Sequence, residues 1–476
     1  MPVRTVAARS VAALLGPLEP DLPAYQALAE GLRRLIADGR ILTGTRLPSE
    51  RSLTAALGVS RTTVTTAYRL LRERGYLLSR QGSGSVVVVP GGRPGGGGLL
   101  APAEPSDEVI DLTCAAAAAV PGTAAAYEAA VAELPHYLAA SGYEPNGLGV
   151  LREALAARFT ERGLPTGADQ IMVTCGTLAA MAVVTRAYLG PGDRLLLESP
   201  SYPNVIATAR RIGVRPVALP LDPTGWDPDA LEAALRQTSP RAAYLIPDYH
   251  NPTGLLMDAP TRVAFGAALA RARTLTIVDE TVVELALGEA AAPPPLAAST
   301  PESVTLGGAS KQYWGGLRVG WLRAPTEQMS LLTQARLTLD LGAPILEQLA
   351  LVHLLAGREQ ARQARAAEMT ASRDALAAAL ANRLPEWRFR LPTGGLSLWC
   401  ELPAPRSSAL VVAAEQEGLL LASGGQFAVE GGLESFLRLP FTQPADVLVA
   451  AVERLARAWD AAGDVAPRST RRPLVA

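Results

Sequence analysis

The chain contains one residue whose type is unusual for its composition. Lys311 is the only lysine among 44 lysine and arginine residues, and it lies in the stretch GGASKQYWGGLRVG. Arginine can replace lysine wherever only positive charge is needed, because a guanidinium stays protonated, but it cannot form an imine with an aldehyde. Chance survival of one surface lysine is the plain alternative. The Gly-rich loop and the polar residues described next favour amine chemistry at Lys311.

Further candidate site residues follow short apolar runs that are typical of strands. These residues are Gly176 and Thr177 after QIMVT, Tyr202 after RLLLE, Asn251 after AAYLI, and Asp279 at the end of TLTIVD. Together with Lys311 and Arg318 they suit pyridoxal phosphate, which needs an amine for its aldehyde, an acid for its pyridine nitrogen, an anion cradle with an arginine for its phosphate, and a stacking ring. We therefore predict pyridoxal 5'-phosphate as the cofactor.

The elements that must position these residues form an α/β pattern. From residue 108 onward, seven short apolar runs alternate with helical periodicity, which predicts a mostly parallel sheet. Ligands of such sheets bind at the carboxyl ends of the strands, where the loops begin. The polar residues above all follow strands, so we expect them to meet in one pocket.

Residues 1–89 carry a different pattern. Apolar residues between positions 28 and 36 share one helical face. A second helix is expected between Ser49, a good N-cap, and Gly58, and a third between Ser60 and Gly75. The following stretch YLLSRQGSGSVVVV is typical of a β-hairpin. This order predicts a winged helix-turn-helix domain.

The third helix of this domain exposes groups that suit DNA. Its first turn carries Arg61, Thr62 and Thr63, and Arg51 lies on the preceding helix. In helix-turn-helix proteins this end enters the major groove. The first 90 residues hold twelve arginines against six acidic residues. Surface arginines usually only meet solvent, but together with the helix-turn-helix they predict DNA binding.

Composition divides the chain and excludes some functions. Residues 90–107 are rich in Gly and Pro and are expected to form a linker of about 23 Å root-mean-square span. The three cysteines and three histidines are scattered, so no metal site is expected. No apolar run is long enough to span a bilayer, and the N-terminus lacks a convincing signal cleavage site, which predicts a cytoplasmic protein.

Residues 24 to about 88 resemble the winged-helix domain of GntR-type bacterial transcription regulators. The motifs TRLPSERSL, GVSRTTV, RGYL and QGSG stand in the order and spacing of that family. The resemblance implies that DNA is contacted by Arg51, Ser60, Arg61, Thr62, Thr63 and, at the wing tip, Gly82.

The rest of the chain, residues 108–470, resembles the fold-type I aminotransferases, with a large and a small subdomain. The tandem arrangement is similar to the MocR-type subgroup of GntR regulators. The resemblance assigns Lys311 to the cofactor aldehyde, Asp279 to the pyridine nitrogen, Asn251 of NPTG to the ring oxygen, and Tyr202 to the ring face. Further roles fall to Gly176, Thr177 and Arg318 at the phosphate, Tyr143 at the phosphate of a partner subunit, and Arg438 of FLRLPF at a substrate carboxylate.

Two positions depart from the aminotransferase pattern. The family commonly has a tyrosine two or three residues after the aspartate, where this chain has Thr281 and Val282. The serine three residues before the lysine is replaced by Gly308. A missing phenol would weaken proton handling and still permit cofactor binding. Transamination is therefore an open question at this stage.

Two functions follow from these observations. The leading hypothesis is a homodimeric transcription regulator in which pyridoxal phosphate, or an amine or amino acid that reacts with it, controls two DNA-binding heads. The alternative is a working class I/II aminotransferase that carries a DNA-binding domain.

Overall fold

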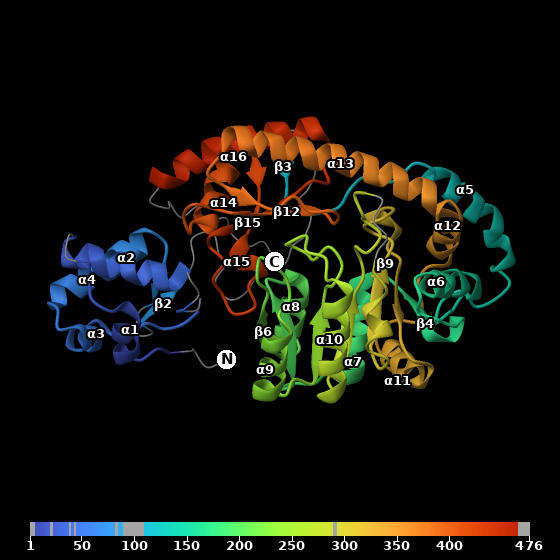
Figure 1. Ribbon diagram of the computed structural model, residues 1–476, viewed down its shortest axis with the longest axis horizontal. Helices are drawn as coiled ribbons and strands as arrows, with labels where there is room; N and C mark the ends of the chain where they lie inside the picture. Colours follow the sequence, from blue (N-terminus) through green and yellow to red (C-terminus); the bar gives the residue numbers. More distant parts are fainter. Residues whose placement is uncertain are drawn as a thin grey trace.

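The computed structural model describes residues 5–19, 22–37, 40–41, 44–80, 84–88, 109–288 and 293–464 (Figure 1). Gly82 and the predicted linker 90–107 lie outside these described residues. We call the described residues between 5 and 88 the head. The remaining described residues form a large and a small subdomain.

The head is a winged helix-turn-helix, as the sequence predicts. Its elements are α1 (Ala8–Leu15), α2 (Ala24–Ala37), α3 (Glu50–Leu57), α4 (Arg61–Glu73), β1 (Leu77–Arg80) and β2 (Gly84–Val87). Strands β1 and β2 pair antiparallel and form the wing. Apolar side chains of all four helices share one core, whose fully buried members include Val11, Leu28, Leu53 and Val64. The sequence analysis did not predict α1, whose Val11 joins this core.

The predicted helix boundaries in the head have clear physical causes. The Ser49 hydroxyl accepts a hydrogen bond from the Ser52 amide at 3.1 Å, and the Ser60 hydroxyl accepts one from the Thr63 amide at 3.0 Å. Both are N-caps that satisfy free amides at a helix start. Gly58 ends α3 with φ of +66°, a conformation that glycine adopts without strain. The turn between α3 and α4 is therefore specified by local sequence.

The large subdomain is built on a seven-stranded sheet of order β4-β10-β9-β8-β7-β5-β6. All strands are parallel to their neighbours except β10, which runs antiparallel to β4 and β9. This agrees with the predicted mostly parallel sheet. The strands are β4 (Ile171–Thr174), β5 (Arg194–Ser199), β6 (Arg215–Pro220), β7 (Ala242–Leu245), β8 (Leu275–Asp279), β9 (Val304–Gly308) and β10 (Gly320–Arg323).

Helices cover both faces of this sheet because successive strand residues point to opposite sides. On one face Leu195 and Leu197 pack with residues of α7 and α11, and on the other Leu196 packs with residues of α9 and α10. The helices are α5 (Thr123–Glu133), α6 (Gly149–Glu161), α7 (Thr177–Tyr188), α8 (Pro203–Arg211), α9 (Pro228–Thr238), α10 (Ala259–Arg271), α11 (Thr326–Leu337) and α12 (Ile345–Ala356). Short 3-10 helices lie at Leu134–His136, Ala168–Gln170, Leu296–Ala298 and Gly315–Leu317.

The small subdomain begins with the long helix α13 (Arg358–Arg383), which runs alongside α16 (Ala445–Asp464) (Figure 1). Below them lies a four-stranded sheet of order β11-β12-β15-β14. Its strands are β11 (Arg388–Phe389), β12 (Ser397–Glu401), β14 (Ala422–Ser423) and β15 (Phe436–Pro440), accompanied by α14 (Ser407–Gln416) and α15 (Gly424–Phe427). Strand β13 (Leu419–Leu420) pairs in parallel with β3 (Ile110–Asp111). The first described strand after the linker is therefore fixed to the small subdomain.

Two absences bear on function. None of the described helices is long and apolar enough to cross a membrane. Within the same described residues, no group of three or more His, Cys, Asp or Glu side chains is arranged to hold a metal ion.

Candidate functional site

Six of the predicted site residues end or follow the strands β4, β5, β7, β8 and β9, whose carboxyl ends lie at one edge of the large sheet: Gly176, Thr177, Tyr202, Asn251, Asp279 and Lys311. Lys311 follows β9, and its Nζ donates a hydrogen bond to the Ala115 carbonyl at 2.7 Å. Burial lowers the pKa of Lys311, and the positive charges of Arg438 and Arg318 lower it further, against the opposing effects of Cys114 and Asp279. A lowered pKa leaves more neutral amine at neutral pH, which is the nucleophilic form.

Asp279 ends β8 and is 7% exposed. One carboxylate oxygen accepts a hydrogen bond from the Thr281 amide at 2.8 Å, and the other accepts one from the Tyr244 hydroxyl. Burial raises the pKa of Asp279, and the donors from Thr281 and Tyr244 act in the opposite direction. The carboxylate is thus fixed in orientation at the strand end.

A cradle for an anion lies at the start of α7. Gly176 has φ of +93° and precedes Thr177, the first residue of the helix. The Arg318 guanidinium donates to the Cys175 carbonyl at 3.3 Å, and a Cβ atom added at Gly176 would lie 2.6 Å from an Arg318 nitrogen. The absence of a side chain at Gly176 thus leaves room for the guanidinium beside the start of α7, and glycine adopts this positive φ without strain. Helix amides and a guanidinium together suit a phosphate.

The two departures from the aminotransferase pattern meet at Thr177. Its hydroxyl donates to the Gly307 carbonyl at 3.1 Å and accepts a hydrogen bond from the Thr281 hydroxyl at 3.2 Å. A Cβ atom added at Gly308 would lie 2.4 Å from this same hydroxyl. The Thr177 hydroxyl thus occupies space that a serine at position 308 would need. Sequence reasoning recorded both departures and missed this contact between them.

Tyr202 and Asn251 lie on neighbouring loops. Tyr202 precedes α8, and its hydroxyl accepts a hydrogen bond from the Asn204 amide group at 3.0 Å. Burial, with a smaller contribution from Asp279, raises the pKa of Tyr202 to about 12, so the phenol stays protonated. The Asn251 side chain makes no hydrogen bond to another residue that the structure describes.

Arg438 lies on β15 and is 2% exposed. Its guanidinium donates to the Thr113 carbonyl and lies 5.0 Å from the centre of the Phe427 ring. Its Nε is buried and has no hydrogen-bond partner among the described residues. Burial lowers the pKa of Arg438 to about 10. A buried cation with an unused donor is suited to bind a ligand carboxylate.

The structure adds two residues that sequence reasoning did not assign to the site. Cys114 lies between Thr113 and Ala115, whose carbonyls accept hydrogen bonds from Arg438 and Lys311, and the Tyr244 hydroxyl donates a hydrogen bond to Asp279. The sequence offered no signal for Cys114 beyond an unpaired cysteine. Tyr143 is not brought to this group, because its side chain is 65% exposed and no contact with the other site residues is present in the described part of the chain.

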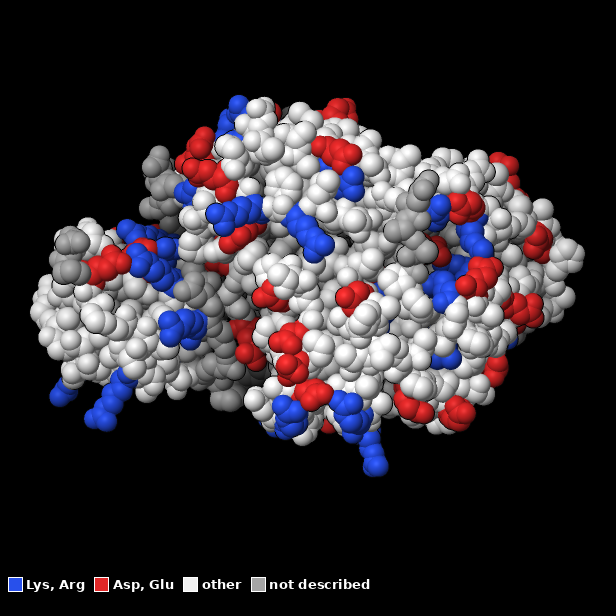
Figure 2. All heavy atoms as spheres, viewed as in Figure 1, with Lys and Arg blue, Asp and Glu red and all other residues white. Residues whose placement is uncertain are grey.

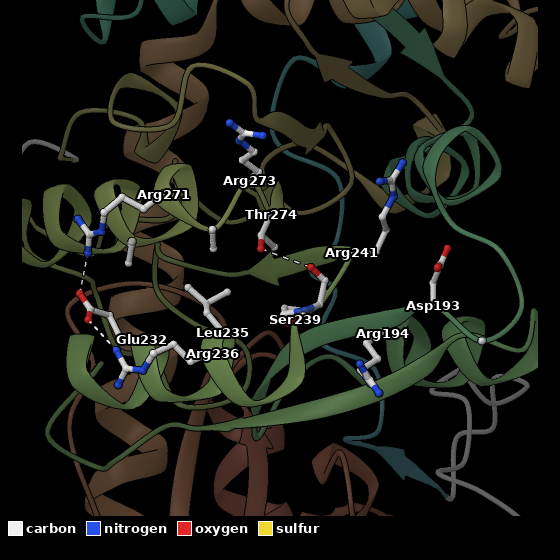
Figure 3. A pocket seen from close by; sticks show the side chains of 14 residues that line it. Asp193, Arg194, Glu232, Leu235, Arg236, Ser239, Arg241, Arg271, Arg273 and Thr274 are labelled. Carbon is white, nitrogen blue, oxygen red and sulfur yellow. Dashed lines mark hydrogen bonds and ion pairs between the residues drawn. The ribbon is translucent and has the colours of Figure 1, made fainter.

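A groove of about 700 Å³ lies away from this site, at the opposite edge of the sheet. It is lined by five arginines, which spread apart in Figure 3 rather than converge. Arg194 donates to the Thr238 carbonyl at the end of α9, and Arg236 and Arg271 both pair with Glu232. Cations at helix carboxyl ends stabilise the helices. We assign these arginines a structural role.

The DNA-contact candidates lie at the start of α4 and on α3. Arg51, Ser60, Arg61 and Thr62 are exposed and Thr63 is half-buried. Arg51 and Arg61 make no hydrogen bond to other described residues, whereas the Ser60 and Thr63 hydroxyls contact each other at 2.8 Å. Figure 2 shows basic side chains projecting from the lower edge of the head. The arginines are thus free to meet DNA, while Ser60 and Thr63 also cap the helix.

Comparisons with known proteins support the predicted class of both parts of the chain. Residues 24–87 match the family of bacterial regulatory proteins named gntR, and residues 129–455 match aminotransferase class I and II. The chain is 34% identical over 298 residues to a 2-aminoadipate transaminase of Thermus thermophilus, covering 61% of this chain and 75% of the relative. It is 31% identical over 406 residues to the HTH-type pyridoxine biosynthesis transcriptional regulator PdxR of Corynebacterium glutamicum, covering 82% and 86%.

Solved structures show the same fold. The alpha-aminoadipate aminotransferase LysN of Thermus thermophilus, complexed with N-(5'-phosphopyridoxyl)-L-leucine, aligns with a TM-score of 0.68 and 30% identity over 75% of this chain and 93% of LysN. A kynurenine aminotransferase of Pyrococcus horikoshii aligns with a TM-score of 0.69 at 23% identity, which supports the fold alone.

A winged helix-turn-helix joined to a fold-type I aminotransferase domain defines a class of DNA-binding transcription regulators. The chain belongs to the aminotransferase class I and II family and, with its gntR head, is a MocR-type regulator of the GntR family. This aminotransferase family depends on pyridoxal phosphate. The anion cradle at Gly176, the buried carboxylate of Asp279 and the lowered pKa of Lys311 fit that cofactor.

Proposed function

We propose that the aminotransferase-like domain of this regulator senses pyridoxal phosphate, or an amine or amino acid that reacts with it, and thereby controls the DNA affinity of the heads. The observation that carries the proposal is Lys311. It is the only lysine of the chain, it is half-buried with a lowered pKa, and it lies among Asp279, Arg318 and Arg438. Solvation or a surface ion pair would not require lysine over arginine.

The residues of the pocket have separate tasks in this proposal. Bound pyridoxal phosphate supplies a reactive aldehyde on an electron-withdrawing ring. Lys311 provides the amine, Asp279 holds a proton at the ring nitrogen, and Asn251 donates to the ring oxygen. Tyr202 covers one face of the ring, while the amides of Gly176 and Thr177 and the guanidinium of Arg318 hold the phosphate. Arg438 binds the carboxylate of an incoming amino acid.

We further propose that the protein is a homodimer with two heads. Large apolar side chains are exposed on one region of the large subdomain: Val131, Leu138, Tyr143, Leu337, Leu339 and Leu341. The segments that carry Tyr143 and Leu341 touch, because Gly342 packs against Glu144 and the Thr333 hydroxyl donates to Asn146 at 3.0 Å. Several large apolar side chains exposed on neighbouring segments are typical of a subunit interface; we call these six residues the exposed apolar patch. In such a dimer Tyr143 would reach the partner's phosphate.

Three organisational statements belong to the same proposal. Residues 1–89 form the DNA-binding domain, residues 90–107 the linker, and residues 108–470 the ligand-binding domain. Operator DNA is the macromolecular partner, in line with the gntR head. The protein acts in the cytoplasm, where the chromosome of a bacterium lies.

A working aminotransferase remains the second candidate. It is favoured by the presence of both a lysine with a lowered pKa and a buried arginine that suits a carboxylate. Incubation with a panel of amino acids and 2-oxo acids separates the two functions. Sustained turnover would favour the enzyme, whereas retained cofactor with slow or absent turnover would favour the regulator.

The cofactor assignment is tested by replacing Lys311. Lys311→Ala should abolish the near-visible absorbance of the protein with pyridoxal phosphate, and borohydride reduction should no longer leave a mass adduct, while circular dichroism stays unchanged. Lys311→Arg is the matched control for charge, and it should lose the adduct equally because a guanidinium cannot react. An adduct that persists in either variant would refute the assignment.

The sensing role needs a separate measurement. A ligand changes DNA affinity only if it binds two conformations differently. Fluorescence anisotropy with operator DNA should therefore give different affinities with and without pyridoxal phosphate or an amine, and Lys311→Ala should remove the difference. Equal affinities under all conditions would leave a DNA-binding protein without a ligand response.

A further inference from the structure

A buried phenol lies beside the acid of the candidate cofactor site. Tyr244 is on β7 and is 1% exposed. In the parallel pairing of β7 with β8 it lies opposite Ile277, two residues before Asp279. Its hydroxyl donates to one oxygen of Asp279, and no other hydrogen bond of this hydroxyl is present among the described residues.

The protonation of the pair is asymmetric. Burial raises the pKa of Tyr244 well above its usual range, and the negative charge of Asp279 raises it further. The phenol therefore stays protonated and can act only as the donor toward the carboxylate. The second oxygen of Asp279 is already engaged by the Thr281 amide at 2.8 Å. Each carboxylate oxygen thus has one protein donor, which fixes the plane of the group.

A buried carboxylate without donors would favour its neutral form. A neutral acid cannot form an ion pair with a protonated pyridine nitrogen. The segment after Asp279 has Thr281 and Val282 in place of the phenol expected there for the ring oxygen. The phenol of Tyr244 is supplied by another strand and acts on the acid instead.

We propose that Tyr244 is a positioning residue that keeps Asp279 ionised and oriented toward the ring nitrogen of pyridoxal phosphate. This rests on the proposed binding of that cofactor. Tyr244 itself does not touch the ligand in this assignment and acts through Asp279. A tyrosine that only filled the core would contribute to stability and leave the cofactor affinity and its pH dependence unchanged.

The test compares Tyr244→Phe with Tyr313→Phe. Tyr313 is also 1% exposed and lies two residues after Lys311, and its hydroxyl has no hydrogen-bond partner among the described residues. Titration of the full-length protein with pyridoxal phosphate, followed by absorbance, should give a dissociation constant about tenfold higher for Tyr244→Phe, because a hydrogen bond to a charged group is lost. Tyr313→Phe should bind like the wild type.

The pH dependence distinguishes positioning from packing. Without the phenol the pKa of Asp279 rises, so the loss of affinity in Tyr244→Phe should grow as the pH is lowered. If Tyr244 had a purely structural role, Tyr244→Phe would shift the melting temperature by the same amount with and without pyridoxal phosphate. The pH profile of the cofactor affinity would then stay parallel to that of the wild type. Wild-type affinity and profile in Tyr244→Phe would overturn the inference.

A double-mutant cycle covers the remaining cases. In the Asp279→Asn background, Tyr244→Phe should cause no further loss of affinity, because the two side chains act as a unit. If Tyr244→Phe alone does not fold, Asp279→Asn is added to remove the buried charge that lost its donor. The double variant should then fold. A double variant that stays unfolded would overturn the inference. Failure of the wild type itself to bind pyridoxal phosphate would refute the proposed function and is recognisable before any variant is made.

Discussion

Position 308 determines how the Thr177 hydroxyl is placed. Gly308 lies in β9, and the absence of a side chain there leaves room for that hydroxyl, which bridges Gly307 and Thr281. The fold-type I pattern has a serine at this position. In the proposed cofactor site, the Thr177 hydroxyl thus lies in the space that the serine of that pattern would need.

Restoring the family residue should weaken the site. In Gly308→Ser the new Cβ would lie 2.4 Å from the Thr177 hydroxyl, so Thr177 must rotate and give up its hydrogen bonds. We expect about tenfold weaker binding of pyridoxal phosphate, measured by absorbance titration. Gly315→Ser is the control, because a Cβ at Gly315 meets no atom within 4 Å. Tighter binding in Gly308→Ser would contradict this account of the Thr177 hydroxyl.

Part of the site could be predicted from single residues, for a physical reason. Lys311, Asp279 and Thr177 follow strands, and the carboxyl ends of parallel strands meet at one edge. Tyr244 lies within β7, where an aromatic residue is typical of the core, and only its pairing with β8 brings it to Asp279. Cys114 comes to the site only because its neighbours bind Lys311 and Arg438, which lie 197 and 324 positions further along the chain. Such information is not local in sequence.

At the scale of elements, α4 combines two tasks in its first turn. Ser60 and Thr63 cap the helix, and Arg61 between them stays exposed. A capped helix start presents its first side chains in a fixed direction. In helix-turn-helix proteins the corresponding end of the recognition helix reads base edges.

Replacing Arg61 tests the assigned orientation of α4. Arg61→Ala should cost about 1 to 3 kcal/mol of specific operator binding and relax the sequence preference at one position, measured by anisotropy with a set of operator variants. Arg69→Ala is the matched control, because Arg69 lies two turns further along the same helix and pairs with Glu73 at 2.6 Å. Operator affinity in Arg61→Ala equal to that of the wild type would show that another part of the head reads the bases.

Elements with strong local signals were predicted and weaker ones were missed. The caps Ser49 and Ser60 and the seven apolar runs of the large sheet gave their elements correctly. Strands β3 and β13 have two residues each, too few for any alternation to be visible, and they exist because they pair with each other. Helix α1 was missed because its short Ala/Val/Leu sequence resembles the apolar part of a targeting segment.

At the scale of the whole molecule, the exposed apolar patch is expected to be buried between two copies. Leu339→Glu places a charge in that contact, and burying an unpaired carboxylate is costly. We expect at least about tenfold weaker dimerisation, measured by analytical ultracentrifugation. Val263→Glu is the control, because Val263 is an exposed apolar residue of α10, on a different helix from the patch. A Leu339→Glu protein that sediments like the wild type would place the subunit contact elsewhere.

The order of strands in the sheet and the position of the small subdomain could not be predicted from sequence. Strand order depends on pairing between distant segments, such as β4 with β10. The resemblance to fold-type I aminotransferases supplied the class of architecture, which residue patterns alone did not specify.

The segment from Ile110 to Ala115 joins two parts of the molecule that are usually discussed separately. It is the first described stretch after the linker, β3 attaches it to β13, and its carbonyls at Thr113 and Ala115 accept hydrogen bonds from Arg438 and Lys311. The first described backbone after the predicted linker therefore contacts two of the candidate site residues. In the proposed sensing function, a ligand that draws Lys311 or Arg438 away from these carbonyls would act directly on the backbone that follows the predicted linker, and no relay of intervening helices would be needed.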